Sequence, residues 1–162
     1  MPTLLFVCTA NRFRSPLAAA YAARQVRDAG LPADWQAASA GTWTPAGLPA
    51  HAKALEAAAR LGLDLSAHRT REVDAALLAA ASLVVVMEPG HKEALEAEFP
   101  ACRGRVALLG ELAGWPDPVI PDPAQANFTD SDAIARAIAA CLDQALPAIR
   151  QRVEKPSPPL LI

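Results

Sequence analysis

The sequence lacks the patterns that mark membrane, disulfide-rich and nucleic-acid-binding proteins. Its apolar runs fall short of the roughly 20 residues that a transmembrane helix needs, and the run from Leu4 to Cys8 is too short for a signal peptide. The three cysteines, Cys8, Cys102 and Cys141, are too few and too widely spaced for a disulfide framework or a zinc site. A formal net charge of -2 offers no footprint for nucleic acid or an anionic membrane. We therefore expect a cytoplasmic protein, in which a reducing environment keeps a working thiol free.

What the sequence does contain is enough apolar residues for one packed domain. With 162 residues, of which 52% are hydrophobic, we expect a single domain over residues 1–153 and a proline-rich tail at 154–162. We expect strands at 3–8, 35–41, 82–87 and 105–109, and helices at 15–30, 50–61, 74–80, 89–99 and from a cap at Thr129 or Asp130 to about 153. This alternation predicts an α/β fold in which helices cover both faces of a parallel sheet.

Residues 4–16, LLFVCTANRFRSP, combine the end of a strand, a short loop and the start of a helix. A loop at a helix N-terminus directs backbone N–H groups and the positive end of the helix dipole at one spot, where an oxyanion such as phosphate fits. Arg14 can hold two of its oxygens through its forked donors. The same positive field favours the thiolate form of Cys8. The sequence thus predicts a nucleophilic sulfur beneath a bound phosphoryl group, with Ser15 as a hydrogen-bond donor to it.

Five motifs, spread over nearly the whole chain, occur in the order and spacing of a known family. They are Cys8–Ser15 (CTANRFRS), Ser39–Thr42 (SAGT), His68–Arg71 (HRTR), Met87-Glu88 and Asp122-Pro123. With them the chain resembles the low-molecular-weight protein tyrosine phosphatase family. The resemblance implies a four-stranded parallel sheet with helices on both faces, which is a Rossmann-like, three-layer arrangement.

The same resemblance implies a cysteine-dependent phosphomonoesterase that needs no metal or organic cofactor. Cys8 would attack phosphorus and form a phosphocysteine, and the substrate would be a phosphorylated protein, with phosphotyrosine expected, or a small phosphomonoester. The phosphate-binding positions that the motif implies are Thr9, Ala10, Asn11, Arg12, Phe13, Arg14 and Ser15. Asn11 would hold the loop in a strained form with support from His68, and Ser15 would stabilise the thiolate.

The reaction also requires an acid, because an alkoxide or phenoxide leaves poorly without a proton. Two aspartates that precede prolines are candidates, Asp117 and Asp122. Asp122 is preferred, because it lies at the family's distance before the final helix, and Asp117 is the alternative. For either residue, a role in a turn or a helix cap is a common one.

The loop departs from the family's pattern at three positions. Ala10 replaces a glycine, and its backbone is strained if the loop requires a positive φ there. Phe13 replaces a second cysteine, so no adjoining thiol can protect the nucleophile as a disulfide. Arg12 stands where many relatives carry an aliphatic residue or threonine, and its charge favours acidic substrates. Farther along the chain, the aromatic residues that often flank phosphotyrosine are replaced by Ala124 and Gln125, which argues against tyrosine specificity.

Several other chemistry-bearing side chains have no role in this interpretation. His51 and His91 are expected on the surface, and Cys102 and Cys141 in structural positions. Trp43 is expected either in the core or as a wall of the site.

Two other functions remain open for such a loop. A thiol-dependent arsenate reductase shares it but requires further cysteines near the third strand and the helix after it, and residues 82–99 contain none. A phosphate-binding regulatory module with weak or no catalysis is suggested by Ala10, Arg12 and Phe13. Phosphoarginine is a further substrate for an enzyme of this class, although relatives that favour it tend to carry threonine at the position of Arg12.

Overall fold

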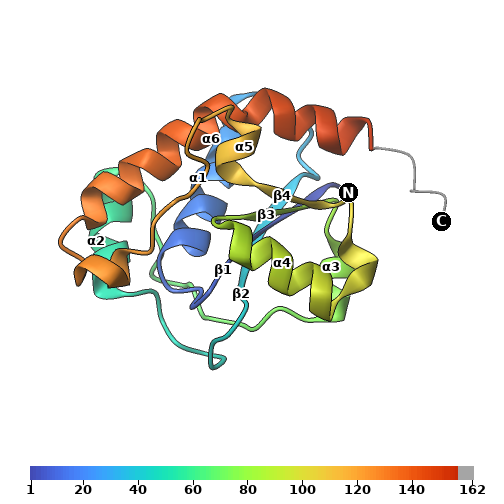
Figure 1. The fold of residues 1–162 in the computed structure, drawn as a ribbon. Helices are drawn as coiled ribbons and strands as arrows, with labels where there is room; N and C mark the ends of the chain where they lie inside the picture. Colours follow the sequence, from blue (N-terminus) through green and yellow to red (C-terminus); the bar gives the residue numbers. More distant parts are fainter. Residues whose placement is uncertain (157–162) are drawn as a thin grey trace.

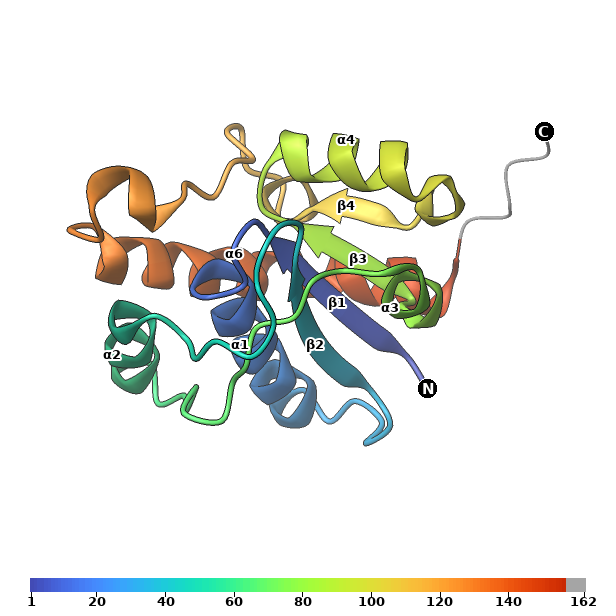
Figure 2. The same ribbon diagram turned by 90° about the horizontal axis from the view of Figure 1, so that it is seen from below.

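The structure, a computed structural model, describes residues 1–156. Its parallel strands form one sheet in the order β2-β1-β3-β4, with helices on both faces (Figures 1 and 2). The strands are β1 (Thr3–Cys8), β2 (Gln36–Gly41), β3 (Leu83–Val86) and β4 (Val106–Leu108). The helices are α1 (Arg14–Asp28), α2 (Ala52–Arg60), α3 (Ala75–Ala80), α4 (Pro89–Glu98), α5 (Leu109–Leu112) and α6 (Ser131–Glu154), with 3-10 segments at Pro100–Cys102 and Pro123–Ala126. The predicted four-stranded parallel α/β fold is confirmed.

Side chains of β1 alternate between two hydrophobic cores, one on each face of the sheet. Leu4, Phe6 and Cys8 point into the core that contains residues of α1, α2 and α6. Leu5 and Val7 point into the core that contains residues of α3 and α4. In Figure 1, α6 runs along one side of the sheet and α3 and α4 lie on the other. The cysteine of the loop therefore leaves the sheet on the face that α1 covers.

β1 ends where the connections of the sheet diverge. The chain passes through α1 to β2 on one side of β1, and the next strand, β3, pairs with β1 on the other side. Cys8 and Gly41 are register partners at this end of the sheet, and Val7 pairs with Val86. Open parallel sheets bind ligands beyond the carboxyl ends of their strands at such a point. The topology thus places Cys8 where a ligand is expected.

The observed helices and strands mostly start and end within a residue or two of the expected positions. α1 stops at Asp28, and Gly30 follows with a φ of 66° that suits a helix end. The expected side-chain cap of the last helix is wrong. Asp130 occupies the capping position but its side chain makes no capping hydrogen bond, and the hydroxyl of Thr129 donates to the carbonyl of Ala126 instead.

Helix α5 was not expected from the sequence, which predicts a strand through Leu109. The chain turns into α5 at that residue, and Gly110 in this helix packs closely against Pro118. A β-carbon at Gly110 would lie 2.3 Å from the carbonyl oxygen of Pro118. This contact is between segments that share no periodic pattern, so the sequence does not reveal it.

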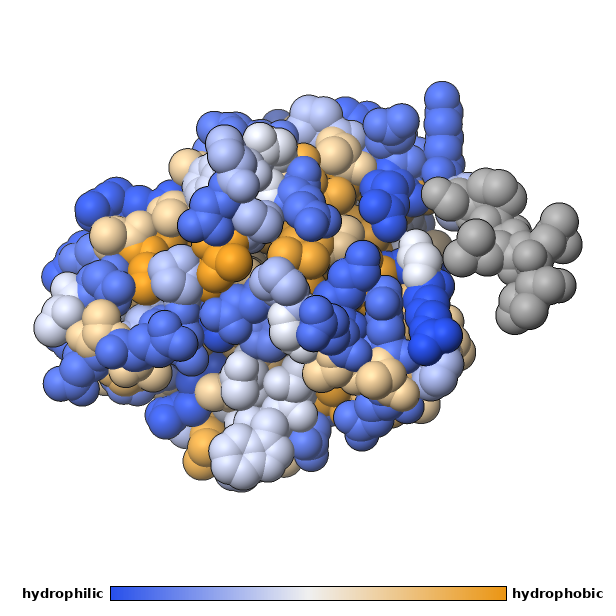
Figure 3. All heavy atoms as spheres, viewed as in Figure 1, coloured by the Kyte–Doolittle hydropathy of each residue, from blue (hydrophilic) through white to orange (hydrophobic). Residues whose placement is uncertain are grey.

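The surface and the chain end complete the fold. No helix among residues 1–156 is long and apolar enough to cross a membrane. Figure 3 shows that hydrophilic residues cover most of the face in view, with apolar residues in separate patches between them. The predicted tail at 154–162 begins inside α6, which ends at Glu154, and residues 157–162 lie outside the described part of the chain.

Candidate active site

The segment Cys8–Arg14, called the CX5R loop below, is held from outside through its carbonyl oxygens. The carbonyls of Cys8, Thr9 and Arg12 accept hydrogen bonds from the backbone N–H groups of residues 42, 43 and 51, at 2.9, 3.1 and 2.9 Å. The N–H groups of residues 10–13, in contrast, donate to no acceptor within residues 1–156. The first amides of α1, which begins at Arg14, also lack partners inside the helix. The loop therefore offers a set of free donors at a helix N-terminus, as an oxyanion site requires.

Asn11 fixes the shape of this loop. It is 0% exposed and has a left-handed φ of 57°. Its Nδ2 donates to the hydroxyls of Ser15 and Ser39, both at 2.9 Å, and its Oδ1 accepts from the N–H of Arg71 at 3.0 Å. Its carbonyl oxygen lies 2.7 Å from Nε2 of His68. Because a carbonyl oxygen can only accept, Nε2 of His68 carries a hydrogen and donates it there; burial lowers the pKa of this ring.

The strain that the sequence places at Ala10 is at Asn11 instead. Ala10 is exposed and does not have a positive φ. Asparagine adopts left-handed backbone more readily than most residues. The loop therefore accepts an alanine at position 10 without backbone strain.

Ser15 lies directly beside the sulfur of Cys8. Their Oγ and Sγ atoms are 3.0 Å apart and hydrogen-bonded, and both residues are buried. Because Asn11 donates to Ser15 Oγ, the hydroxyl hydrogen of Ser15 is free to point at Sγ or at the carbonyl of Ala40, 3.4 Å away. With the sulfur ionised, the shorter of these contacts is an O–H···S⁻ hydrogen bond.

Arg14 is buried at the end of the loop between two carboxylates. Its side chain is 3% exposed, with Nη1 3.1 Å from Glu88 Oε1 and Nη2 3.6 Å from Asp122 Oδ2. Nη1 also donates to the carbonyl of Ile120 at 2.8 Å. Its Nε has no hydrogen-bond partner in the described part of the chain. These contacts orient the guanidinium and leave the edge with Nε and Nη2 for two oxygens of a ligand.

The structure brings Asp122, and not Asp117, to Arg14. Asp122 Oδ1 accepts from the N–H of Ala124 at 3.0 Å, which starts the 3-10 segment, and Oδ2 is the oxygen that approaches Arg14. Asp117 is exposed, and its Oδ1 accepts from the N–H of Val119 at 3.1 Å. It therefore serves the turn role that is common for aspartate.

The expectation that His91 lies on the surface is wrong. His91 is 5% exposed, and its Nε2 lies 3.0 Å from the hydroxyl of Thr9 in the CX5R loop. A signal was present in the sequence, because Pro89 starts α4 three residues after Val86, the last residue of β3. A residue in that first turn lies near the carboxyl edge of the sheet, where the site is.

His51, which is expected on the surface, is half-buried and packs against an aromatic ring beside the loop. Its ring stacks on Phe128 with the ring centroids 3.8 Å apart, and its Nδ1 accepts from the N–H of Lys53 at the start of α2. The aromatic ring of Phe13, which is buried, lies 6.5 Å from that of Phe128. Aromatic side chains from three separate segments thus gather on one side of the loop.

The remaining sequence candidates are settled by their burial. The side chain of Trp43 is 81% exposed, so it is not a core residue. Cys102 and Cys141 are buried free thiols. Burial raises the pKa of Cys102, and it raises that of Cys141 to about 12. These two cysteines are therefore structural, as the sequence predicts.

Gly41 is the point where β2 touches the loop, and its replacement tests the loop's shape. A β-carbon there would lie 2.6 Å from the carbonyl oxygen of Thr9 and 3.1 Å from Cβ of Asn11. We expect Gly41→Ala to lower the free energy of unfolding by about 1–3 kcal/mol through overpacking, and to reduce catalytic activity because the loop must shift. Gly90→Ala is the matched control, since open space surrounds Gly90. Thermal unfolding and kinetics of the two variants test this, and equal behaviour would contradict it.

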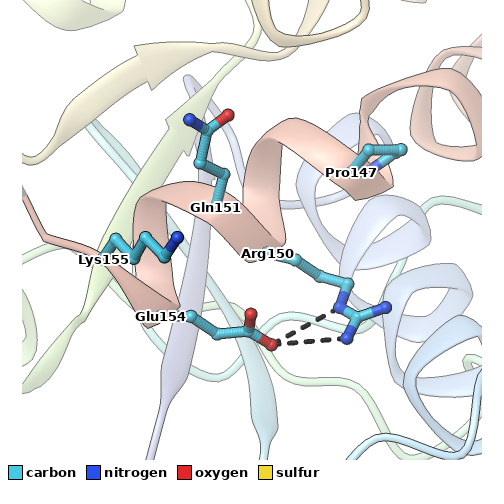
Figure 4. Close-up of a pocket in the computed structure, with 5 residues that line it drawn as sticks. All are labelled: Pro147, Arg150, Gln151, Glu154 and Lys155. Atoms are coloured by element: carbon cyan, nitrogen blue, oxygen red, sulfur yellow. Dashed lines mark hydrogen bonds and ion pairs between the residues drawn. The ribbon is translucent and has the colours of Figure 1, made fainter.

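A surface hollow is lined by residues that are far from the CX5R loop in the sequence. Figure 4 shows that residues near the C-terminal end of α6 line it, with Arg150 and Glu154 joined by an ion pair. The pair is half exposed and spans one helix turn, so it contributes little. No residue of the CX5R loop lines this hollow.

A cysteine, an arginine and an aspartate around free amides, at the carboxyl edge of a parallel sheet, define a phosphate-ester hydrolase with a nucleophilic thiol. The family model described as "Low molecular weight phosphotyrosine protein phosphatase" matches residues 3–158. The chain belongs to this family. It is a cysteine-dependent phosphatase, and phosphorylated compounds are its substrates.

Three similar proteins illustrate the relationship. The low molecular weight protein-tyrosine-phosphatase of Streptomyces coelicolor is 34% identical over 158 residues, covering 92% of this chain and 94% of the relative. A protein-arginine-phosphatase of Geobacillus stearothermophilus is 31% identical over 120 residues, covering 74% of this chain and 77% of the relative. The crystal structure of the low molecular weight protein tyrosine phosphatase from T. tengcongensis has a TM-score of 0.83 at 29% identity and covers 91% of this chain and 99% of that chain.

Proposed function

We propose that this protein hydrolyses phosphotyrosine in proteins through a phosphocysteine at Cys8. The observation that carries the proposal is the convergence at one sheet edge of Sγ with Ser15 at 3.0 Å, free loop amides, and Arg14 within 3.6 Å of Asp122. In the bound state, the N–H groups of residues 10–13 and one edge of the Arg14 guanidinium hold the phosphoryl oxygens. This set of fixed donors is worth most where charge accumulates in the transition state.

The reaction proceeds in two displacements. In the first, the Cys8 thiolate attacks phosphorus, the S–P bond forms, and the bond from phosphorus to the ester oxygen breaks. Asp122, protonated at that stage, gives its proton to the leaving oxygen. In the second, the Asp122 carboxylate removes a proton from water, the water oxygen attacks phosphorus, and the S–P bond breaks. The electron pair returns to sulfur, and phosphate leaves.

Ser15 supports both displacements from beside the sulfur. Asn11 donates to Ser15 Oγ, so the Ser15 hydroxyl has its own hydrogen for the thiolate. His68 and Arg71 hold Asn11 from the other side of the loop. A reducing cytoplasm, which the free thiols predict, suits this chemistry because no neighbouring cysteine protects Cys8 from oxidation.

The surroundings of the loop support a substrate that is a phosphorylated protein with an aromatic leaving group. Ala124 and Gln125 provide no aromatic wall, but the stacked pair of His51 and Phe128 lies on the Arg12 side, where the carbonyl of Arg12 binds the backbone of His51. The family's description names phosphotyrosine. The relative from Geobacillus stearothermophilus is named a protein-arginine-phosphatase. Phosphoarginine is therefore the competing substrate that the experiment must compare with phosphotyrosine.

The test compares variants of the two aspartates on substrates whose leaving groups differ in their need for a proton. We expect wild type to hydrolyse p-nitrophenyl phosphate and a phosphotyrosine peptide faster than phosphoserine or phosphoarginine peptides of the same sequence. Asp122→Asn should lower kcat for the phosphotyrosine peptide about 10²-fold and less for p-nitrophenyl phosphate, whose leaving group needs a proton less. The control is Asp117→Asn, which should match wild type. Faster hydrolysis of phosphoarginine, or equal losses in the two variants, would overturn the proposal.

A further inference from the structure

His91 is a buried side chain that neither the CX5R motif nor the mechanism above uses. It lies in the first turn of α4 and is 5% exposed. Its Nε2 is 3.0 Å from Thr9 Oγ1 and 3.7 Å from Glu88 Oε2. Its Nδ1 is buried and has no hydrogen-bond partner among residues 1–156. The other oxygen of Glu88 binds Arg14, so His91 contacts the start of the CX5R loop directly and is linked to its end through Glu88.

These contacts determine where the ring proton lies. Nε2 faces a hydroxyl and a carboxylate, both of which can accept a hydrogen bond, whereas a proton on Nδ1 would be buried without an acceptor. The neutral ring therefore carries its proton on Nε2 and donates it to Thr9 Oγ1. Burial, with a contribution from Arg14 on α1 against the opposing carboxylates of Glu88 and Asp122, lowers the pKa of His91 to about 4. The ring is thus neutral at ordinary pH.

The direction of this hydrogen bond decides what the Thr9 hydroxyl can do. His91 is the hydroxyl's only partner in the described part of the chain. Since that hydroxyl accepts from His91, its own hydrogen is free to be donated to another group. Thr9 directly follows the nucleophile and precedes the free amides of residues 10–13, so an acceptor bound there is the phosphoryl group.

We propose that His91 is a positioning residue that turns the hydroxyl hydrogen of Thr9 into the CX5R loop, where it becomes a side-chain donor to a phosphoryl oxygen. This inference rests on the proposed phosphatase function and adds to it one specific donor. Accepting from His91 also strengthens the hydroxyl as a donor, because linked hydrogen bonds polarise one another. A neutral donor suits this place better than a cation, which would compete with Arg14 for Glu88.

The test is direct calorimetric binding of inorganic phosphate to wild type, Thr9→Val, His91→Leu and the double variant. Losing a hydrogen bond to a charged group should weaken phosphate binding about tenfold in each single variant. The phosphate affinity of the double variant should equal that of the single variant with the lower affinity, because both changes remove the same donor. His91→Gln should recover most of the affinity, since its amide N–H can replace Nε2–H. A purely structural role for His91 predicts additive losses and no such rescue.

Controls separate this inference from folding and from the proposed function. Glu93→Gln, an exposed position on α4, should bind phosphate as wild type does, and thermal unfolding shows whether His91→Leu folds. If it does not, Thr9→Val and His91→Gln still decide the matter. Unchanged phosphate affinity in Thr9→Val, or additive losses in the double variant, would overturn the inference. Turnover of p-nitrophenyl phosphate by the same wild-type sample tests the proposed function separately, since phosphate binding does not depend on turnover.

Discussion

Cys8→Ser is expected to lower kcat for p-nitrophenyl phosphate by at least about 10³-fold while the protein still binds phosphate. A serine hydroxyl is a weak nucleophile unless a base removes its proton. No such base contacts the sulfur, because the described partner of Cys8 Sγ is the hydroxyl of Ser15. The loop amides and Arg14 do not depend on the sulfur, so the oxyanion site persists. Steady-state kinetics together with calorimetric phosphate binding measure both effects.

The matched control for this variant is Cys102→Ala. Cys102 is a buried thiol in the 3-10 segment Pro100–Cys102. It lies in the core on the face of the sheet opposite α1, and it has no part in the chemistry. We expect this variant to keep wild-type kcat even if it loses some stability. A phosphorylated protein trapped from wild type during turnover, together with the loss of turnover in Cys8→Ser, locates the intermediate. Substantial turnover by Cys8→Ser would exclude the phosphocysteine mechanism.

The sequence was sufficient for the fold and for the outline of the site because both depend on local patterns. A continuous apolar segment such as 82–87 predicts a buried parallel strand by itself. The string from Cys8 to Pro16 places a thiol at a strand end and an arginine at a helix start. The resemblance to the family favours Asp122 over Asp117, because Asp122 lies at the family's distance before the last helix, and the structure brings that residue to Arg14.

What the sequence could not predict depends on contacts between distant segments. Pro89 signals that His91 lies near the carboxyl edge of the sheet, but the contact of His91 with Thr9 joins residues 82 positions apart, and no local pattern shows that partner. The positive φ at Asn11 rather than Ala10 follows from bonds to residues 39 and 71 on other segments. The stack of His51 on Phe128 likewise connects α2 to the segment before α6. In each case the deciding partner lies outside the local pattern.

The burial of Arg14 between carboxylates leads to the second large expected effect, that of Arg14→Lys. This change keeps the positive charge but removes the planar fork. The guanidinium serves the carbonyl of Ile120 and the carboxylate of Glu88 through Nη1 and still has an edge for the ligand. A lysine ammonium is a single point charge and cannot satisfy these partners and two phosphoryl oxygens at once. Losing two charge-assisted hydrogen bonds predicts a fall in kcat/KM of about 10²–10⁴-fold.

The control for Arg14→Lys lies on the same helix. Arg24 also binds a backbone carbonyl, that of Leu61, through its guanidinium, but it lies away from the CX5R loop. Arg24→Lys should keep kcat/KM within a few-fold of wild type, which separates the loss of the fork in the site from a general loss of helix packing. Thermal unfolding should show that Arg14→Lys is folded but less stable, since a single ammonium group cannot contact both Glu88 and Asp122. If Arg14→Lys instead kept wild-type kcat/KM, the loop amides alone would bind the phosphoryl group, and the guanidinium would serve only to hold the two carboxylates.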